Sequence, residues 1–131
     1  MGNSESRARK WALFLAHRPE FPARERFLAA FEAGRITRLC DCGCNSFDIE
    51  VPADSKVVPL CEAGTSGGAV FQLSFNTQET PGSIEFIVFA DKRGHLDGVE
   101  VDYCANSFPV PEEPAILEPP YHVEVSHALG A

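Results

Sequence analysis

The spacing of apolar residues is helical over the first part of the chain. Ala8, Trp11, Phe14 and Leu15 recur at intervals of three and four residues, which places them on one face of a helix. Pro19 follows and cannot continue a helix, so we expect this first helix to end before it.

A second helix is indicated between Pro22 and Gly34. Proline favours the first turn of a helix, and glycine favours the position just past its end. Phe27, Leu28 and Phe31 form the apolar stripe of this segment. The sequence therefore predicts two amino-terminal helices, each with one apolar face to bury.

Beyond residue 34 apolar and polar residues alternate, which is typical of strands that bury one face. The alternation predicts about five strands, at 36–40, 47–51, 71–75, 84–90 and 99–103. Residues 84–90 are apolar at both parities except for Glu85, so we expect this strand to be central and covered on much of both faces. Asp91–Gly94 has the composition of a tight turn that joins the last two strands as an antiparallel pair.

These elements predict an α+β fold in which the two helices pack on one face of a mostly antiparallel sheet. We expect residues 1–108 to form a single domain, because this length can bury a core without a disulfide or a metal. Prolines recur from Pro109 onward. Residues 109–131 are therefore predicted to be a proline-rich C-terminal tail in an extended conformation.

The formal net charge of −8 is unevenly distributed along the chain. Residues 1–38 hold eight basic and four acidic residues, a net charge of +4. Residues 39–131 hold three basic and fifteen acidic residues, a net charge of −12. Because nucleic-acid binding depends on basic side chains that meet phosphates, we expect no nucleic-acid partner.

Much of this negative charge lies on the polar sides of the predicted strands. The carboxylates concerned are Asp48, Glu50, Glu85, Glu100 and Asp102. If these side chains share one face, the open side of the sheet is a negative surface that attracts a basic protein partner. The competing interpretation is that the charge only keeps the protein soluble.

The cysteines indicate a reducing compartment. Their number, five, is odd, whereas secreted disulfide frameworks usually have even counts. The apolar run at residues 11–16 is shorter than that of an export signal, and no stretch approaches the length of a membrane span. We therefore expect a cytoplasmic protein with reduced thiols and no membrane partner.

Three cysteines, Cys40, Cys42 and Cys44, stand at alternate positions. In an extended segment their thiols would point the same way and could bind zinc or another metal with a fourth ligand from elsewhere. The usual zinc spacing is C-x-x-C in two pairs, and Gly43 favours a turn that would break the shared direction. The main alternative is that the cysteines are buried packing residues, and a redox or enzymatic role of Cys42 or Cys44 is a third.

No set of nucleophile, base and acid can be assembled from the sequence, and the four histidines are scattered. The sequence therefore favours a non-enzymatic protein-binding domain over an enzyme. The alternative to a binding domain is a metalloprotein in which the cysteine cluster binds zinc or another metal. Zinc is the one cofactor that these residues suggest.

The run LCDCGCNSFDIEV, residues 39–51, resembles small bacterial proteins with a C-x-C-G-C-x-S signature followed by an alternating strand. Residues 94–101 resemble a second segment of these proteins, G-x-L-x-x-V-E-V, and the nearest likeness is to Burkholderia-like proteobacterial versions. The resemblance spans about residues 36–104 and implies no activity and no catalytic residue. In being small, acidic and α+β, the chain is also similar to immunity proteins of bacterial toxin systems, which implies a protein partner.

Overall fold

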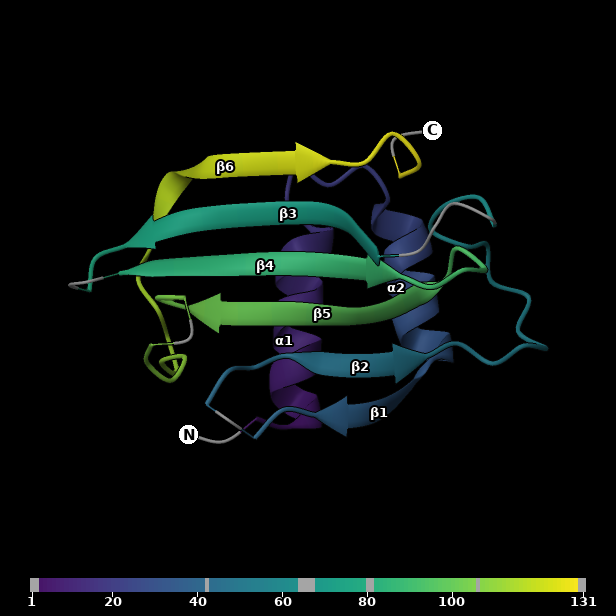
Figure 1. The fold of residues 1–131 in the computed structure, drawn as a ribbon, viewed down its shortest axis with the longest axis horizontal. Coiled ribbons are helices and arrows are strands. Elements are labelled where there is room, and N and C mark those ends of the chain that lie inside the picture. The colour runs from purple at the N-terminus through teal and green to yellow at the C-terminus, as the bar shows by residue number, and fades with distance from the viewer. Residues whose placement is uncertain (1–2, 42, 64–67, 80–81, 106, 130–131) are drawn as a thin grey trace.

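Two helices precede six strands in the described part of the chain (Figure 1). The computed structural model describes residues 3–41, 43–63, 68–79, 82–105 and 107–129. The helices are α1 (Glu5–Ala16) and α2 (Arg24–Ala33). The strands are β1 (Arg35–Leu39), β2 (Phe47–Glu50), β3 (Gly68–Thr77), β4 (Ser83–Ala90), β5 (Leu96–Tyr103) and β6 (Ile116–Val125).

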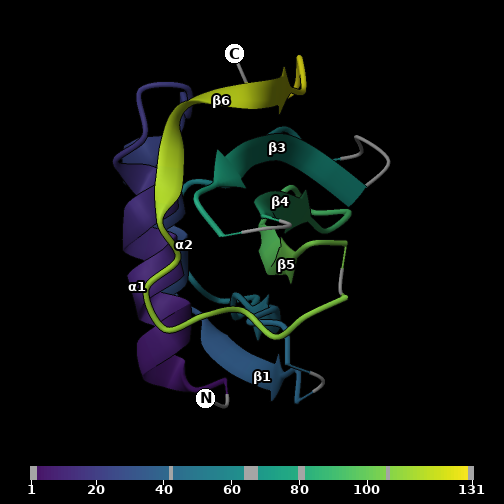
Figure 2. The same ribbon diagram turned by 90° about the vertical axis from the view of Figure 1, so that its left-hand side faces the viewer.

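Both predicted helices form within the expected segments. The Ser4 hydroxyl caps α1 by accepting a hydrogen bond from the backbone N–H of Arg7 at 3.1 Å. Gly34 is the residue at which α2 ends. Figure 2 shows that the two helices lie on the same side of the sheet. Neither described helix has the length and apolar character needed to cross a bilayer.

The strands form one sheet in the order β1-β2-β5-β4-β3-β6, and neighbouring strands are antiparallel throughout. The predicted α+β fold with an antiparallel sheet is therefore confirmed. β4 lies inside the sheet, as expected, and its two faces differ in burial. Glu85, Ile87 and Phe89 are only half-buried, because the helices lie on the opposite side of the sheet (Figure 2).

The core lies between the helices and the inner face of the sheet, and aromatic rings from both layers meet there. The ring of Trp11 on α1 lies 5.2 Å from that of Phe86 on β4, between centroids. The rings of Phe21 and Phe71 are 4.8 Å apart, so the loop between the helices also packs on the sheet. Burying each such side chain contributes roughly 1.5–3 kcal/mol, which makes this contact layer the main source of stability.

The sixth strand lies inside the segment that the sequence predicts as a proline-rich tail. β6 pairs with β3, so residues 116–125 belong to the same sheet as the other strands (Figure 1). Val110 and Leu129, on either side of β6, are buried in the core. Pro119 and Pro120 interrupt the strand pattern in the sequence, but they are tolerated here because β6 is an edge strand.

Ion pairs between the amino-terminal residues, on and just after α1, and the carboxyl-terminal segment hold β6 against the rest of the fold. Two nitrogens of the Arg18 guanidinium donate to the two carboxylate oxygens of Glu118, at 2.6 and 2.9 Å. The hydrogen bonds to Glu118 and Glu20 raise the pKa of Arg18 above its ordinary value. Lys10 lies 3.3 Å from a carboxylate oxygen of Glu113. The basic amino-terminal residues thus neutralise part of the negative charge of residues 39–131.

A buried polar cluster ties α1 to the turn after β1 and to the carboxyl-terminal segment. The Arg7 guanidinium donates to the side-chain oxygen of Asn45 at 2.7 Å and to the carbonyl oxygens of Pro111 and Glu112 at 2.9 and 2.7 Å. The indole N–H of Trp11 donates to the same Asn45 oxygen at 2.8 Å. Three chain segments that are far apart in sequence are therefore joined at one point.

Candidate functional site

The predicted carboxylates lie together on the open face of the sheet, the face away from the helices. Glu85 on β4 is directly opposite Asp102 on β5, and Glu100 is opposite Ile87. Asp48 on β2 is opposite Gly98 on β5. Because residues directly opposite in an antiparallel pair point to the same face, these strands combine their polar sides into one surface.

Two of the five predicted carboxylates are paired with arginines of β1. The Nε atom of Arg38 donates to Asp48 at 2.9 Å, and this hydrogen bond raises the pKa of Arg38. A guanidinium nitrogen of Arg35 lies 3.6 Å from a carboxylate oxygen of Glu50. All four side chains are exposed, so each pair contributes little to stability, but together they neutralise this side of the surface.

The other three predicted residues, Glu85, Glu100 and Asp102, form what we call the carboxylate cluster. Gln72 and Ser74 of β3 both donate hydrogen bonds to one carboxylate oxygen of Glu85, at 2.9 and 3.1 Å. Among the residues that the structure describes, no basic side chain forms an ion pair with any member of the cluster. Neutral donors therefore orient Glu85, and no basic side chain of the described residues neutralises the charge of the cluster.

The electrostatics of the cluster follow from this arrangement. Partial burial raises the pKa of Asp102, and the nearby charge of Glu85 raises it further. Partial burial also raises the pKa of Glu100, with smaller contributions from Asp102 and Glu85. Each group is thus harder to ionise than an isolated carboxyl because it is partly desolvated beside like charges. A bound cation would relieve this repulsion.

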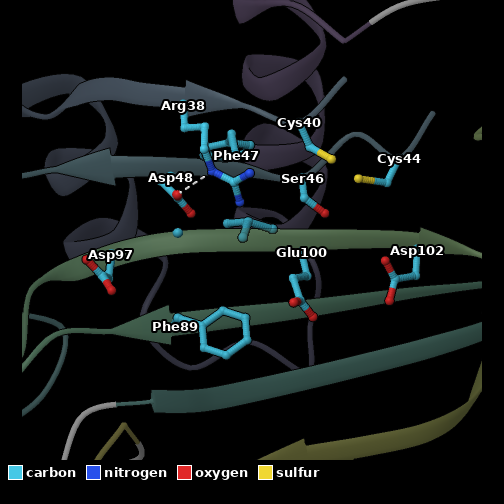
Figure 3. Close-up of a pocket in the computed structure, with 12 residues that line it drawn as sticks. Arg38, Cys40, Cys44, Ser46, Phe47, Asp48, Phe89, Asp97, Glu100 and Asp102 are labelled. Carbon is cyan, nitrogen blue, oxygen red and sulfur yellow. Dashed lines mark hydrogen bonds and ion pairs between the residues drawn. The ribbon is translucent and has the colours of Figure 1, made fainter. Parts of the chain in front are cut away.

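A pocket of about 380 Å³ opens beside the cluster, between β1, β2, β5 and β4 (Figure 3). Gly98 lies in its floor with the half-buried ring of Phe89 opposite it on β4. A side chain at position 98 would fill this space, and its Cβ would lie 2.9 Å from the carbonyl oxygen of Phe47. The pocket therefore exists because a glycine stands where the neighbouring strands approach closely. Its walls combine carboxylates with one aromatic ring.

Two of the three clustered cysteines lie at the rim of the same pocket. Cys40 and Cys44 both line it, and Figure 3 shows their sulfur atoms directed toward each other, across the pocket from Glu100 and Asp102. Between them Gly43 has a φ of 103°, so the chain turns and does not continue as a strand. The carbonyl oxygen of Gly43 accepts a hydrogen bond from Val110 at 3.0 Å, which fixes the turn to the carboxyl-terminal segment.

The predicted metal ligands are therefore not presented by one straight strand. Cys44 is buried and Cys40 is half-buried, while Cys42 lies outside the described residues. Within the described ranges, no group of three or more histidine, cysteine or acidic side chains is arranged to bind a metal ion. Zinc binding by this cluster stays a prediction.

Several residues of the pocket, among them Asp97, Arg38 and Phe89, were not identified from the sequence. Asp97 has the parity of the buried Val99 and Val101, so alternation would place it on the inner face, but a register shift between β4 and β5 interrupts the pattern and Asp97 lines the pocket. Partial burial and the charges of Asp91 and Asp48 raise the pKa of Asp97. Arg38 and Phe89 were assigned to the strands but not to the surface. The strand order, which brings β2 beside β5, is what places them around one pocket.

Chemically, the site is suited to bind a cation that carries an apolar stem. The carboxylate cluster supplies negative charge, and Ile87 and Phe89 supply a half-buried apolar surface beside it. The side chains of lysine and arginine combine these two properties, because their methylene groups pack on apolar surface while the charge stays in a polar environment. The ring of Phe89 can also contact a cation through its face.

Comparison of the chain with protein-family models, with curated proteins and with solved structures found no match in any of the three. The resemblance to bacterial proteins with the C-x-C-G-C-x-S signature therefore stays a prediction.

Proposed function

We propose that this protein is a non-enzymatic binding domain that holds a basic protein partner on the open face of its sheet. The observation that carries the proposal is the carboxylate cluster itself. Glu100 and Asp102 have raised pKa values because they are partly desolvated among like charges. An arrangement that costs the free protein stability is explained if a lysine or arginine of a partner neutralises it in the complex.

The surroundings of the cluster favour a protein partner over a small inorganic cation. The half-buried Ile87 and Phe89 lie on β4 beside the cluster, and the pocket floor at Gly98 leaves room for a side chain to enter. An inorganic ion would gain nothing from this apolar surface, whereas a basic side chain would bury its methylene groups there. Residues 39–131 carry a net charge of −12, and their long-range electrostatic field would speed the encounter with a basic partner.

An immunity-like role is one form of this proposal, in which the acidic face covers a basic surface of a toxin. It is supported by the similarity in size, acidity and fold class to immunity proteins. We propose that the encounter takes place in the cytoplasm, where the thiols of the pocket rim stay reduced.

The test uses a synthetic peptide that alternates lysine and leucine, with its affinity measured by calorimetry at low and high salt. The cluster variant Glu100→Gln with Asp102→Asn removes two charges from the site. The control variant Asp54→Asn with Glu112→Gln removes two exposed charges elsewhere, so both variants have the same net charge. Any difference between them therefore reports the location of binding and not the overall field.

We expect the cluster variant to bind about tenfold more weakly than the control variant, because two contacts of roughly 0.7 kcal/mol each are lost. We also expect wild-type affinity to fall as salt rises. Equal affinities of the two variants, or binding that is insensitive to salt, would contradict the proposed site.

A further inference from the structure

The outer edge of β6 is the second feature of this fold that is suited to an interaction. β6 ends the sheet beyond β3, and no strand in the described part of the chain pairs with its outer side (Figure 1). An unpaired strand edge presents a row of backbone donors and acceptors to any chain that can align with it.

The direction of these backbone groups follows from one hydrogen bond. The N–H of Ser126 donates to the carbonyl oxygen of Val70 at 2.9 Å, so Ser126 faces β3. Backbone groups alternate in direction along a strand, and the register pairs Glu124 with Gln72. Glu124 and His122 therefore also face β3 with their backbone groups. The N–H and C=O groups of Tyr121, Val123 and Val125 consequently point away from the sheet.

The side chains on this stretch are unusually apolar for an exposed edge. Tyr121, Val123 and Val125 are 58%, 41% and 40% exposed, and as alternate residues they share one face of the strand. The opposite edge of the sheet, β1, is only five residues long and carries two arginines, features that discourage pairing. On β6 the prolines at 119 and 120 protect the first half of the edge and leave residues 121–125 available.

We propose that residues 121–125 of β6 pair antiparallel with the same residues of a second copy of this chain, centred on Val123. In this register Val123 lies opposite its own counterpart, and Tyr121 lies opposite Val125 of the second copy. These are the positions whose backbone groups point outward, so both copies exchange hydrogen bonds there.

Complementary polar side chains favour this alignment. His122 lies opposite Glu124 of the second copy, and the two-fold symmetry repeats the contact, so an imidazole meets a carboxylate at both places. These residues form the closer, non-hydrogen-bonded type of pair, in which side chains are nearest. Within one chain the two groups are 3.9 Å apart, which shows that their side chains occupy the same side of the strand. In a parallel alignment each residue would instead lie beside the same residue of the second copy, so His122 would meet His122 and Glu124 would meet Glu124.

The consequence for the assembly is geometric. The two-fold axis of an antiparallel strand pair is perpendicular to the sheet, so the two sheets continue as one. Both open faces then look in the same direction, and a dimer presents two carboxylate clusters to one side. Because a five-residue strand pair buries less than a standard interface, we expect a dissociation constant in the micromolar range.

The test is sedimentation velocity of the full chain in reducing buffer, from about 1 µM to about 500 µM, a range that brackets a micromolar constant. Val123→Lys places two like charges opposite each other at the centre of the pair. Leu117→Lys is its matched control, since Leu117 is 39% exposed on the same strand but lies before the prolines. Circular dichroism confirms that each variant is folded before its association is measured.

We expect the wild type and Leu117→Lys to dimerise alike, and Val123→Lys to associate about tenfold or more weakly. Glu124→Lys should also weaken association, and the double variant His122→Glu with Glu124→Lys should restore it, because exchanging the charges preserves the complementarity of this register. A wild type that stays monomeric to the highest concentration overturns the proposal. So does a dimer that Val123→Lys leaves intact, or a charge exchange that fails to restore association.

Discussion

Glu85 and Asp102 lie directly opposite each other on β4 and β5, two like charges on the open face of the sheet. Such a pair opposes folding, and partial burial strengthens the effect. We therefore predict that Asp102→Asn raises the free energy of unfolding at pH 7 by about 0.5 kcal/mol, a modest value because water screens the half-buried pair. Urea denaturation measures this change. Asp54→Asn, at an exposed position away from the cluster, should leave the stability unaltered.

The pH dependence of stability provides a second prediction. The folded-state pKa values of Glu100 and Asp102 are raised, so between the ordinary carboxyl pKa of about 4 and the raised values the folded state binds more protons than the unfolded state. Ionisation of these groups therefore lowers stability as the pH rises through that window. Glu20, whose pKa is lowered by its hydrogen bond to Arg18, acts with the opposite sign.

Comparing the stability of the wild type with that of a variant lacking two charges of the carboxylate cluster isolates the contribution of the cluster. The variant Glu100→Gln with Asp102→Asn should be more stable than the wild type at pH 7, and the difference should shrink toward zero as the pH falls below about 4. Unfolding curves of both proteins across this range are the measurement. A difference that is constant with pH would show that the effect comes from packing and not from charge.

The hydrogen bonds between the Arg7 guanidinium and the side-chain oxygen of Asn45 join α1 to the turn after β1, and Arg7 also binds the carboxyl-terminal segment. Replacing Asn45 with alanine leaves a buried guanidinium and the indole N–H of Trp11 without this acceptor. We predict a loss of about 3 kcal/mol in the free energy of unfolding. The matched control is Arg9→Met, which removes an exposed arginine paired with Glu32 and should cost under about 1 kcal/mol.

Removal of residues 109–131 should unfold the protein. The deletion takes away β6, the buried side chains of Val110 and Leu129, and the two carbonyl oxygens that accept hydrogen bonds from Arg7. It also exposes β3 as a new edge with an apolar inner face. Circular dichroism and thermal unfolding of residues 1–108 measure the effect. A cooperative transition near that of the full chain would show that the tail is dispensable.

The parts of the fold that follow from local pattern were predictable from the sequence. The helices and β2 to β5 each bury one face, so their spacing carries the information, and the turn at Asp91–Gly94 forms as its residues indicate. The Asp91 carboxylate accepts hydrogen bonds from the backbone N–H groups of Arg93 and His95. β6 was not predicted as a strand because two prolines interrupt it and only its position at the sheet edge makes them acceptable.

The candidate site was predictable only in part. That the carboxylates of β2, β4 and β5 alternate with buried residues is visible in the sequence, but their neighbours depend on strand order. Asp48 lies opposite Gly98 of β5 on one side and is paired with Arg38 of β1 on the other, so its charge is neutralised, while no described basic side chain pairs with Glu100. Alternation alone cannot distinguish these two carboxylates, since the difference arises from a pairing with Arg38 on another strand, ten positions away.

The most direct test of the carboxylate cluster as a docking site is the map of amide chemical-shift changes in a two-dimensional NMR titration with the lysine–leucine peptide. We expect the largest changes at Ile87, Phe89, Gly98, Glu100 and Asp102, and we expect them to vanish in the variant Glu100→Gln with Asp102→Asn. Changes that spread evenly over the acidic residues, or that centre on the helices, would contradict this docking site.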